Sequence, residues 1–128
     1  MKNFDKWNEV KKNLEESNSA RTFPKEGEVW MMYCGLNVGS EQNGSGEGFS
    51  RPALILKKFN NTMFWIVPLS TKQKEIDYYF NFTDVNELQV SVILAQLKLV
   101  SIKRLSRKMY QMKSDLFTCI KYKIIKML

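Results

Sequence analysis

The chain has 128 residues, of which 44% are hydrophobic, so it is long enough for one domain with a buried core. It contains no histidine, which excludes Ser-His-Asp triads, Cys-His pairs and His-ligated zinc. The formal net charge of +7 favours a polyanionic partner such as nucleic acid, with a basic surface that serves only solubility as the alternative.

The N-terminal residues have the period of an amphipathic helix. Phe4, Trp7, Val10 and Leu14 recur every three or four positions among charged and polar residues. The segment SNSARTFPKEGE that follows is rich in turn and breaker residues, which is typical of a linker. We therefore expect an N-terminal helical extension over residues 1–20 and one compact domain over residues 21–128.

Short apolar segments that are rich in β-branched and aromatic residues predict a series of strands. These segments cover residues 29–34, 52–59, 63–69, 76–82, 90–94 and 97–102. An antiparallel sheet or a small barrel is the economical arrangement for them. A closing helix follows, for which Ser114 is a suitable N-cap and in which Leu116, Ile120, Ile124 and Leu128 repeat every four residues.

Neither the apolar segments nor the N-terminus predicts a membrane or secreted protein. No stretch approaches ~20 consecutive apolar residues, and charges are scattered through the first residues, with no apolar region before a cleavage site. We therefore expect a cytoplasmic protein without a membrane partner. Cys34 and Cys119 lack a CxxC or Cys/His spacing, which predicts buried free thiols and no metal site.

One arginine stands where a polar, glycine-rich segment meets an apolar one. Four of the six glycines lie within residues 39–48, so the backbone there can adopt positive φ angles. Pro52 restricts its own φ, and residues 53–56 have the composition of a buried strand. Arg51 is therefore expected at the junction of loop and sheet, where a cation can face a bound ligand.

The order of several short segments resembles the MazF/PemK family of toxins from bacterial toxin–antitoxin pairs. These segments are GEVW, GSEQ, RPALIL, FNN, VPLST, SVILAQ and SIKRL, and the resemblance runs from about Lys25 to the C-terminus. Gly-Ser-Glu-Gln followed by Arg-Pro is the most specific part. The resemblance implies a mainly β (α+β) fold: an SH3-like β-barrel of the MazF/PemK/CcdB type with a C-terminal helix, here preceded by the N-terminal helical extension. It also implies a homodimer.

The resemblance further implies metal-independent cleavage of single-stranded RNA without a cofactor. In the family's reaction the 2′-hydroxyl of the RNA attacks the adjacent phosphorus and leaves a 2′,3′-cyclic phosphate and a 5′-hydroxyl. Arg51 matches the family's catalytic arginine, and Ser70 matches its catalytic threonine, with Thr71 adjacent and able to substitute. Glu41 is the carboxylate considered as a base. The plain alternatives are a surface salt bridge for Arg51, a strand end for Ser70 and Thr71, and a solvated charge for Glu41.

The same resemblance assigns RNA-binding residues and partners. Ser40, Gln42, Lys72 and Gln96 are expected to bind RNA, although Gln96 beside a strand can equally serve as scaffold. Residues 43–50 lengthen the loop relative to the family, so its cleavage sequence cannot be carried over. A cognate antitoxin with an acidic, partly disordered segment is the expected protein partner. A non-catalytic RNA-binding relative and a gyrase-inhibiting CcdB-like toxin are the alternative functions, and the C-terminal Trp-Gly-Ile of CcdB is absent here.

Overall fold

The structure is a computed structural model that describes residues 23–34 and 50–128. The expected N-terminal helix lies outside these residues. The strands are β1 (Glu28–Tyr33), β2 (Ser50–Lys58), β3 (Met63–Ser70), β4 (Tyr79–Thr83), β5 (Gln89–Ile93), β6 (Lys98–Ser101) and β7 (Leu105–Gln111). Short 3₁₀ helices, η1 (Leu94–Gln96) and η2 (Ile102–Arg104), follow β5 and β6, and the helix α2 (Ser114–Met127) closes the chain.

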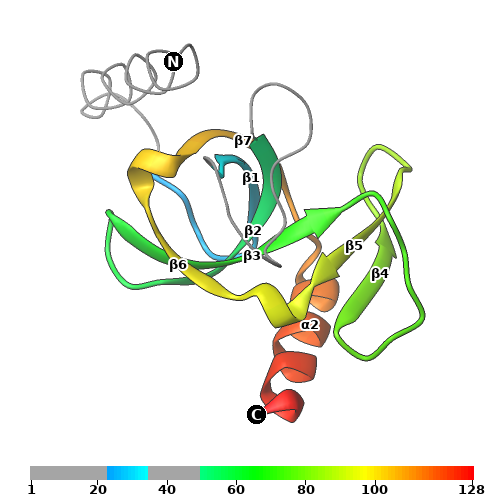
Figure 1. Cartoon of the computed structure of the whole chain (residues 1–128). Coiled ribbons are helices and arrows are strands. Elements are labelled where there is room, and N and C mark those ends of the chain that lie inside the picture. The colour runs from blue at the N-terminus through cyan, green and yellow to red at the C-terminus, as the bar shows by residue number, and fades with distance from the viewer. Residues whose placement is uncertain (1–22, 35–49) are drawn as a thin grey trace.

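The strands form one antiparallel sheet in the order β4-β5-β3-β2-β1-β7, and β6 pairs with β3 beside this path. The β4–β5 pair projects from the end of β3, and α2 lies below the sheet (Figure 1). The predicted mainly β fold with a C-terminal helix is thus confirmed. Among the described residues, β4 and β7 remain at opposite ends of the strand order, so the closed barrel implied by the resemblance is not confirmed.

Side-chain alternation divides the buried residues between the two faces of the sheet. One face carries what we call the helix-side core, because Ile120 of α2 packs into it together with Val29, Leu54 and Val67. The opposite face carries the second core. Its buried members are Trp30, Met32, Cys34, Ala53, Ile55, Phe64, Ile66, Val100, Ile102 and Leu105.

Beyond shifts of one or two residues at the strand ends, three features differ from those predicted. The strand expected to start at residue 76 begins at Tyr79, because the Tyr79 N–H donates to the Ile76 carbonyl in a turn, 3.0 Å away. Strand β7 is an additional element, which has no continuous apolar run because Arg107 and Lys108 stand next to each other inside it. The N-cap of α2 is Lys113, with no side-chain hydrogen bond, so the assignment of Ser114 as N-cap was wrong.

Both cysteines lie in the described residues and are free thiols, as predicted, but only Cys34 is buried. Cys34 follows the last residue of β1 and lies inside the second core. Cys119 is exposed, which corrects the prediction. In α2 it is directly followed by Ile120, the residue of this helix that is fully buried, so the thiol lies beside the buried stripe and not on it.

The GEVW segment has a structural role at the start of the sheet. Gly27 has φ of +91°, a conformation that other L-residues rarely adopt, and an added Cβ would lie 2.9 Å from Nε2 of Gln111. Its N–H donates to the Ile55 carbonyl at 2.9 Å, and its carbonyl accepts from the Met112 N–H at 2.9 Å. Gly27 therefore joins β2 to the segment between β7 and α2.

Glu28 is a buried carboxylate with three partners. Its Oε1 accepts from the Lys25 N–H and from Nε1 of Trp30, both at 2.9 Å, and its Oε2 lies 3.2 Å from Nζ of Lys108. Burial raises the pKa of Glu28, but the hydrogen bonds from Trp30 and Lys25 and the nearby Lys108 outweigh it, so the pKa lies below its ordinary value. The carboxylate stays ionised and connects β1 to β7.

Candidate active site

The structure brings Arg51 and Ser70 together at one end of the sheet. Arg51 is the second residue of β2, and Ser70 is the last residue of β3. The register pairs Ala53 with Pro68, and continuing it by two residues places Arg51 opposite Ser70. Nη1 of Arg51 donates to the Leu69 carbonyl at 3.1 Å, which holds the guanidinium against the end of β3.

Side-chain alternation places both residues on the same face of the sheet. Arg51 continues the alternation of Ala53 and Ile55, which belong to the second core, and Ser70 continues that of Ile66. This is the face opposite to α2. Arg51 and Ser70 are both partly exposed, so solvent or a ligand can reach them.

A turn after β3 fixes the Ser70 hydroxyl. The Lys72 N–H donates to Oγ of Ser70 at 3.1 Å, so this bond uses a lone pair of the oxygen and leaves the hydroxyl proton able to donate. Thr71 is exposed beside it. The hydroxyls of Ser70 and Thr71 therefore lie next to each other after β3, and the hydrogen bond from the Lys72 N–H orients that of Ser70.

Three polar side chains attach this turn to strands β4 and β5. The buried Ser91 donates from Oγ to the Lys72 carbonyl at 2.6 Å. Nε2 of Gln73 donates to the carbonyls of Phe82 and Val90, at 3.3 and 2.9 Å. Nδ2 of Asn81 donates to the Lys74 carbonyl at 3.1 Å. Ser91, Gln73 and Asn81 could not be predicted from the sequence, because no local pattern signals hydrogen bonds between residues that are 7 to 19 positions apart.

Further cations gather at the end of β1. Nη1 of Arg104 donates to the carbonyls of Tyr33 and Cys34, at 3.2 and 3.0 Å. Burial raises the pKa of the Cys34 thiol, and the positive charges of Lys98, Arg51 and Arg104 act in the opposite direction. Arg104 is thus held at the end of β1, and the charges of Lys98 and Arg51 are near enough to act on the same thiol.

Two of the other predicted site residues, Lys72 and Gln96, lie within the described residues. Lys72 is exposed in the turn after Ser70. Gln96 lies in η1, between β5 and β6, which both pair with β3. Among the hydrogen bonds of the described residues, none joins Gln96 to Arg51 or Ser70. Ser40, Glu41 and Gln42 lie outside the described residues.

Within residues 23–34 and 50–128, no group of three or more Cys, Asp or Glu side chains is placed to hold a metal ion. In the same residues, no helix has the length and apolar character needed to cross a membrane. What the site offers chemically is a guanidinium and a hydroxyl on one face of the sheet, with the cations Lys98 and Arg104 near the end of β1. Such groups bind phosphate oxygens and stabilise negative charge on them.

Solved structures share this fold. MazF from Deinococcus radiodurans aligns with a TM-score of 0.69 at 15% identity, over 84% of this chain and 97% of that one. A mycobacterial endoribonuclease in complex with its cognate antitoxin aligns with a TM-score of 0.63 at 14% identity, over 80% and 92%. The Mycobacterium tuberculosis toxin MazF-mt6 aligns with a TM-score of 0.60 at 13% identity, over 77% and 93%.

A search of curated proteins gives no match. The family model described as "PemK-like, MazF-like toxin of type II toxin-antitoxin system" matches residues 25–128. This range contains every described strand, the helix α2 and the site residues Arg51, Ser70, Thr71, Lys72 and Gln96. The chain therefore belongs to the PemK-like, MazF-like toxins of type II toxin–antitoxin systems.

Proposed function

We propose that this protein is the endoribonuclease toxin of a type II toxin–antitoxin system and cleaves single-stranded RNA without a metal. The observation that carries the proposal is the placement of Arg51 beside Ser70, on one face of the sheet, in a member of this toxin family. The fold likeness to a mycobacterial endoribonuclease is consistent with it.

In the proposed reaction, the RNA supplies its own nucleophile. Its 2′-hydroxyl loses its proton to a base and attacks the adjacent phosphorus, and the bond to the 5′-oxygen breaks. The departing 5′-oxygen takes up a proton from the Ser70 hydroxyl, which water reprotonates, or directly from water, so the products are a 2′,3′-cyclic phosphate and a 5′-hydroxyl. The Arg51 guanidinium stabilises the charge that develops on the phosphoryl oxygens, and its bond to the Leu69 carbonyl orients it in advance. The Ser70 hydroxyl donates to a phosphoryl oxygen, with Thr71 as its substitute.

Other residues of this chain assist in the same proposal. Lys98 and Arg104 add positive charge around the end of β1, which favours a polyanion. Lys72 and Gln96 contact the RNA, and Ser40 and Gln42 line its groove from the segment between β1 and β2. Glu41 is the proposed base that accepts the 2′-hydroxyl proton.

We also propose a homodimer and an acidic antitoxin. Helix α2 exposes several apolar side chains, Tyr122, Ile125, Met127 and Leu128, that one subunit leaves in contact with water. The MazE–MazF complex of Deinococcus radiodurans and the mycobacterial complex are solved examples of similar chains bound to an antitoxin. An acidic segment of the antitoxin would occupy the cationic face around Arg51 and so block RNA.

The test is incubation of the purified protein with mixed unstructured RNA in excess EDTA, followed by analysis of the product ends. We expect 2′,3′-cyclic phosphate and 5′-hydroxyl ends. Cleavage that stops in EDTA, or that leaves 5′-phosphate ends, would contradict the proposed chemistry. RNA binding without any cleavage would favour the alternative of a non-catalytic RNA-binding relative.

A further inference from the structure

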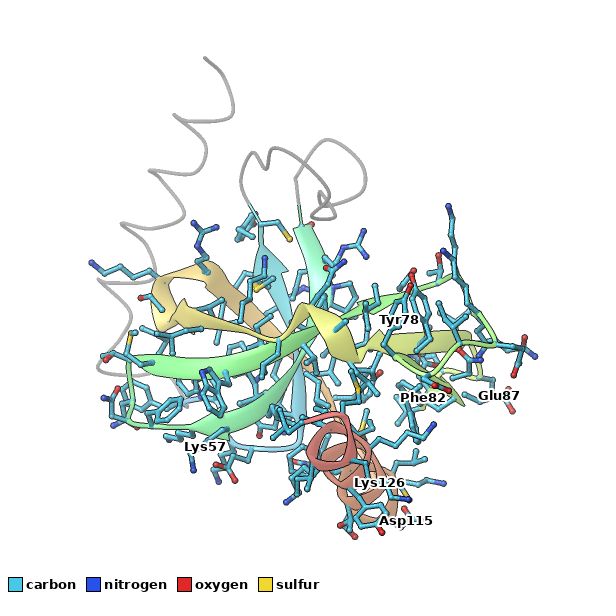
Figure 2. The ribbon with its side chains drawn as sticks, turned by 60° about the horizontal axis from the view of Figure 1, so that its bottom comes forward. Lys57, Tyr78, Phe82, Glu87, Asp115 and Lys126 are labelled. Atoms are coloured by element: carbon cyan, nitrogen blue, oxygen red, sulfur yellow. The ribbon has the colours of Figure 1, made fainter. Side chains whose placement is uncertain are left out.

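An exposed tyrosine stands on a fixed backbone at the start of β4. The Tyr78 side chain is 43% exposed. Its carbonyl accepts from the Leu94 N–H at 2.8 Å, and the following Tyr79 N–H donates to the Ile76 carbonyl at 3.0 Å. Figure 2 shows Tyr78 on the β4 side of the molecule, apart from Lys126 of α2. The ring is therefore presented to solvent by backbone that is bonded on both sides.

The ring of Tyr78 contacts a neighbouring ring, that of Tyr79, which lies on the face that carries Arg51 and Ser70. Tyr79 is paired with Ile93, and its buried ring alternates with Phe80 and Phe82, which pack on the helix-side core; Tyr79 thus belongs to the opposite face. The Tyr78 and Tyr79 rings are in edge contact, with centroids 5.5 Å apart.

Two lysines lie between Tyr78 and Ser70 along the chain. Nζ of Lys74 is 5.4 Å from the centre of the Tyr79 ring, and the backbone of Lys72 is held by Ser91. Both side chains are exposed. An exposed aromatic ring with lysines on the neighbouring segment is the composition of surfaces that stack nucleic-acid bases while the cations attract the phosphates.

The register gives the separation between the ring and the reacting groups. Ser70 pairs with Ser91 and Asn81 pairs with Ser91, so these three residues form one row across β3, β5 and β4. Tyr78 lies three residues before Asn81, two strands from β3. With ~4.8 Å between strands and ~3.3 Å per residue, its Cα lies on the order of 14 Å from that of Ser70, within reach of a nucleotide near the cleaved phosphate.

We propose that Tyr78 stacks on a base of the bound single-stranded RNA, a few nucleotides from the phosphate held by Arg51 and Ser70, and that Lys72 and Lys74 contact the intervening backbone. This inference rests on the proposed endoribonuclease function and adds a base-binding position to it. Stacking accepts any base, so Tyr78 contributes affinity and sets the position of the strand without reading its sequence.

The cleavage position of an RNA oligonucleotide is first mapped with the wild-type protein. The test then uses the same oligonucleotide with one 2′-deoxy nucleotide at that position, because the missing 2′-hydroxyl blocks the reaction and allows equilibrium binding to be measured. Tyr78→Ala is expected to raise Kd by roughly 5- to 150-fold, the range for loss of one stacked base, and Tyr78→Phe is expected to bind like the wild type. Phe59→Ala is the matched control, because Phe59 is 46% exposed, lies under Nζ of Lys57 at 5.6 Å and is in the turn between β2 and β3, at the end of β3 opposite to Ser70.

A series of oligonucleotides that each lack one base identifies the partner of the ring. One position is expected to weaken binding to the wild type and to Tyr78→Phe but to leave Tyr78→Ala unaffected. Thermal melts check that each variant is folded. Given a wild type that cleaves RNA, any one of three results would show that the stacking proposal is wrong. These are a Tyr78→Ala protein that binds like the wild type, a Tyr78→Phe protein that also loses binding, and the absence of any position with this coupling. A wild type that neither binds nor cleaves RNA would instead overturn the proposed function itself.

Discussion

Replacing Ser91 with alanine tests whether the turn after β3 must be held in place for the site to work. Ser91 is fully buried, and its hydroxyl donates to the Lys72 carbonyl at 2.6 Å. The N–H of the same Lys72 donates to Oγ of Ser70, so one residue connects the buried serine to the proposed catalytic hydroxyl. The substitution keeps the Cβ and removes this connection alone.

The expected cost is about 1–2 kcal/mol of unfolding free energy, because one hydrogen bond is lost and water replaces part of it at the exposed Lys72. For a domain of this size, that corresponds to a fall in Tm of roughly 3–10 °C. A displacement of Ser70 by on the order of 1 Å is expected to lower the cleavage rate by ~10–100-fold.

The assay pairs thermal melts with single-turnover cleavage of unstructured RNA. Ser106→Ala is the control, because Oγ of Ser106 also donates to a backbone carbonyl, that of Met31 at 3.2 Å, but does not contact the turn. We expect both variants to have a lower Tm than the wild type. Only Ser91→Ala is expected to cleave RNA more slowly at a temperature at which both variants are folded. A Ser91→Ala protein with a lower Tm and the wild-type cleavage rate would refute the reasoning.

Three further predictions concern stability and the two hydroxyls. Glu28→Gln should lower Tm at neutral pH. Folding lowers the pKa of Glu28, so the ionised carboxylate stabilises the folded state fully above its ordinary pKa of 4.5, and this stabilisation is lost as the pH falls through the pKa in the folded state. The Tm values of wild type and variant should therefore converge in acid, and a difference in Tm that does not depend on pH would contradict this. Gly27→Ala should lower Tm by several degrees, since a Cβ at φ of +91° is strained and meets Gln111; an unchanged melt would contradict the assigned strain. Ser70→Ala combined with Thr71→Ala should reduce cleavage by more than the product of the single effects, and strictly multiplicative effects in single-turnover assays would show that Thr71 does not substitute.

The elements with local signals could be predicted from the sequence. Strand β2 follows from the unbroken apolar run after Pro52, and α2 follows from the four-residue repeat that includes Ile120. Strand β7 could not be predicted in the same way, because its pairing with β1 sustains it although Arg107 and Lys108 interrupt its apolar residues.

The candidate site divides in the same manner. Arg51 and Ser70 could be proposed from the sequence because each lies in a short segment with a distinctive order of residues. Their neighbours depend on contacts between distant segments: Arg104 contacts the end of β1 70 residues away, and Ser91 contacts Lys72 19 residues away. A hydroxyl or a guanidinium in a single sequence carries no sign of such a partner. The roles of Glu41, Ser40 and Gln42 stay predictions.

The measurement that tests the central proposal most directly is the single-turnover cleavage rate of Arg51→Ala on unstructured RNA in excess EDTA. Lys126→Ala removes the same charge from α2, which Figure 2 shows away from Tyr78, and serves as the control. We predict that Arg51→Ala loses ~10²–10³-fold in rate, that Arg51→Lys recovers RNA binding better than turnover, and that Lys126→Ala cleaves like the wild type. An Arg51→Ala protein with an unchanged melt and a wild-type rate would remove this arginine from the chemistry and contradict the proposed active site.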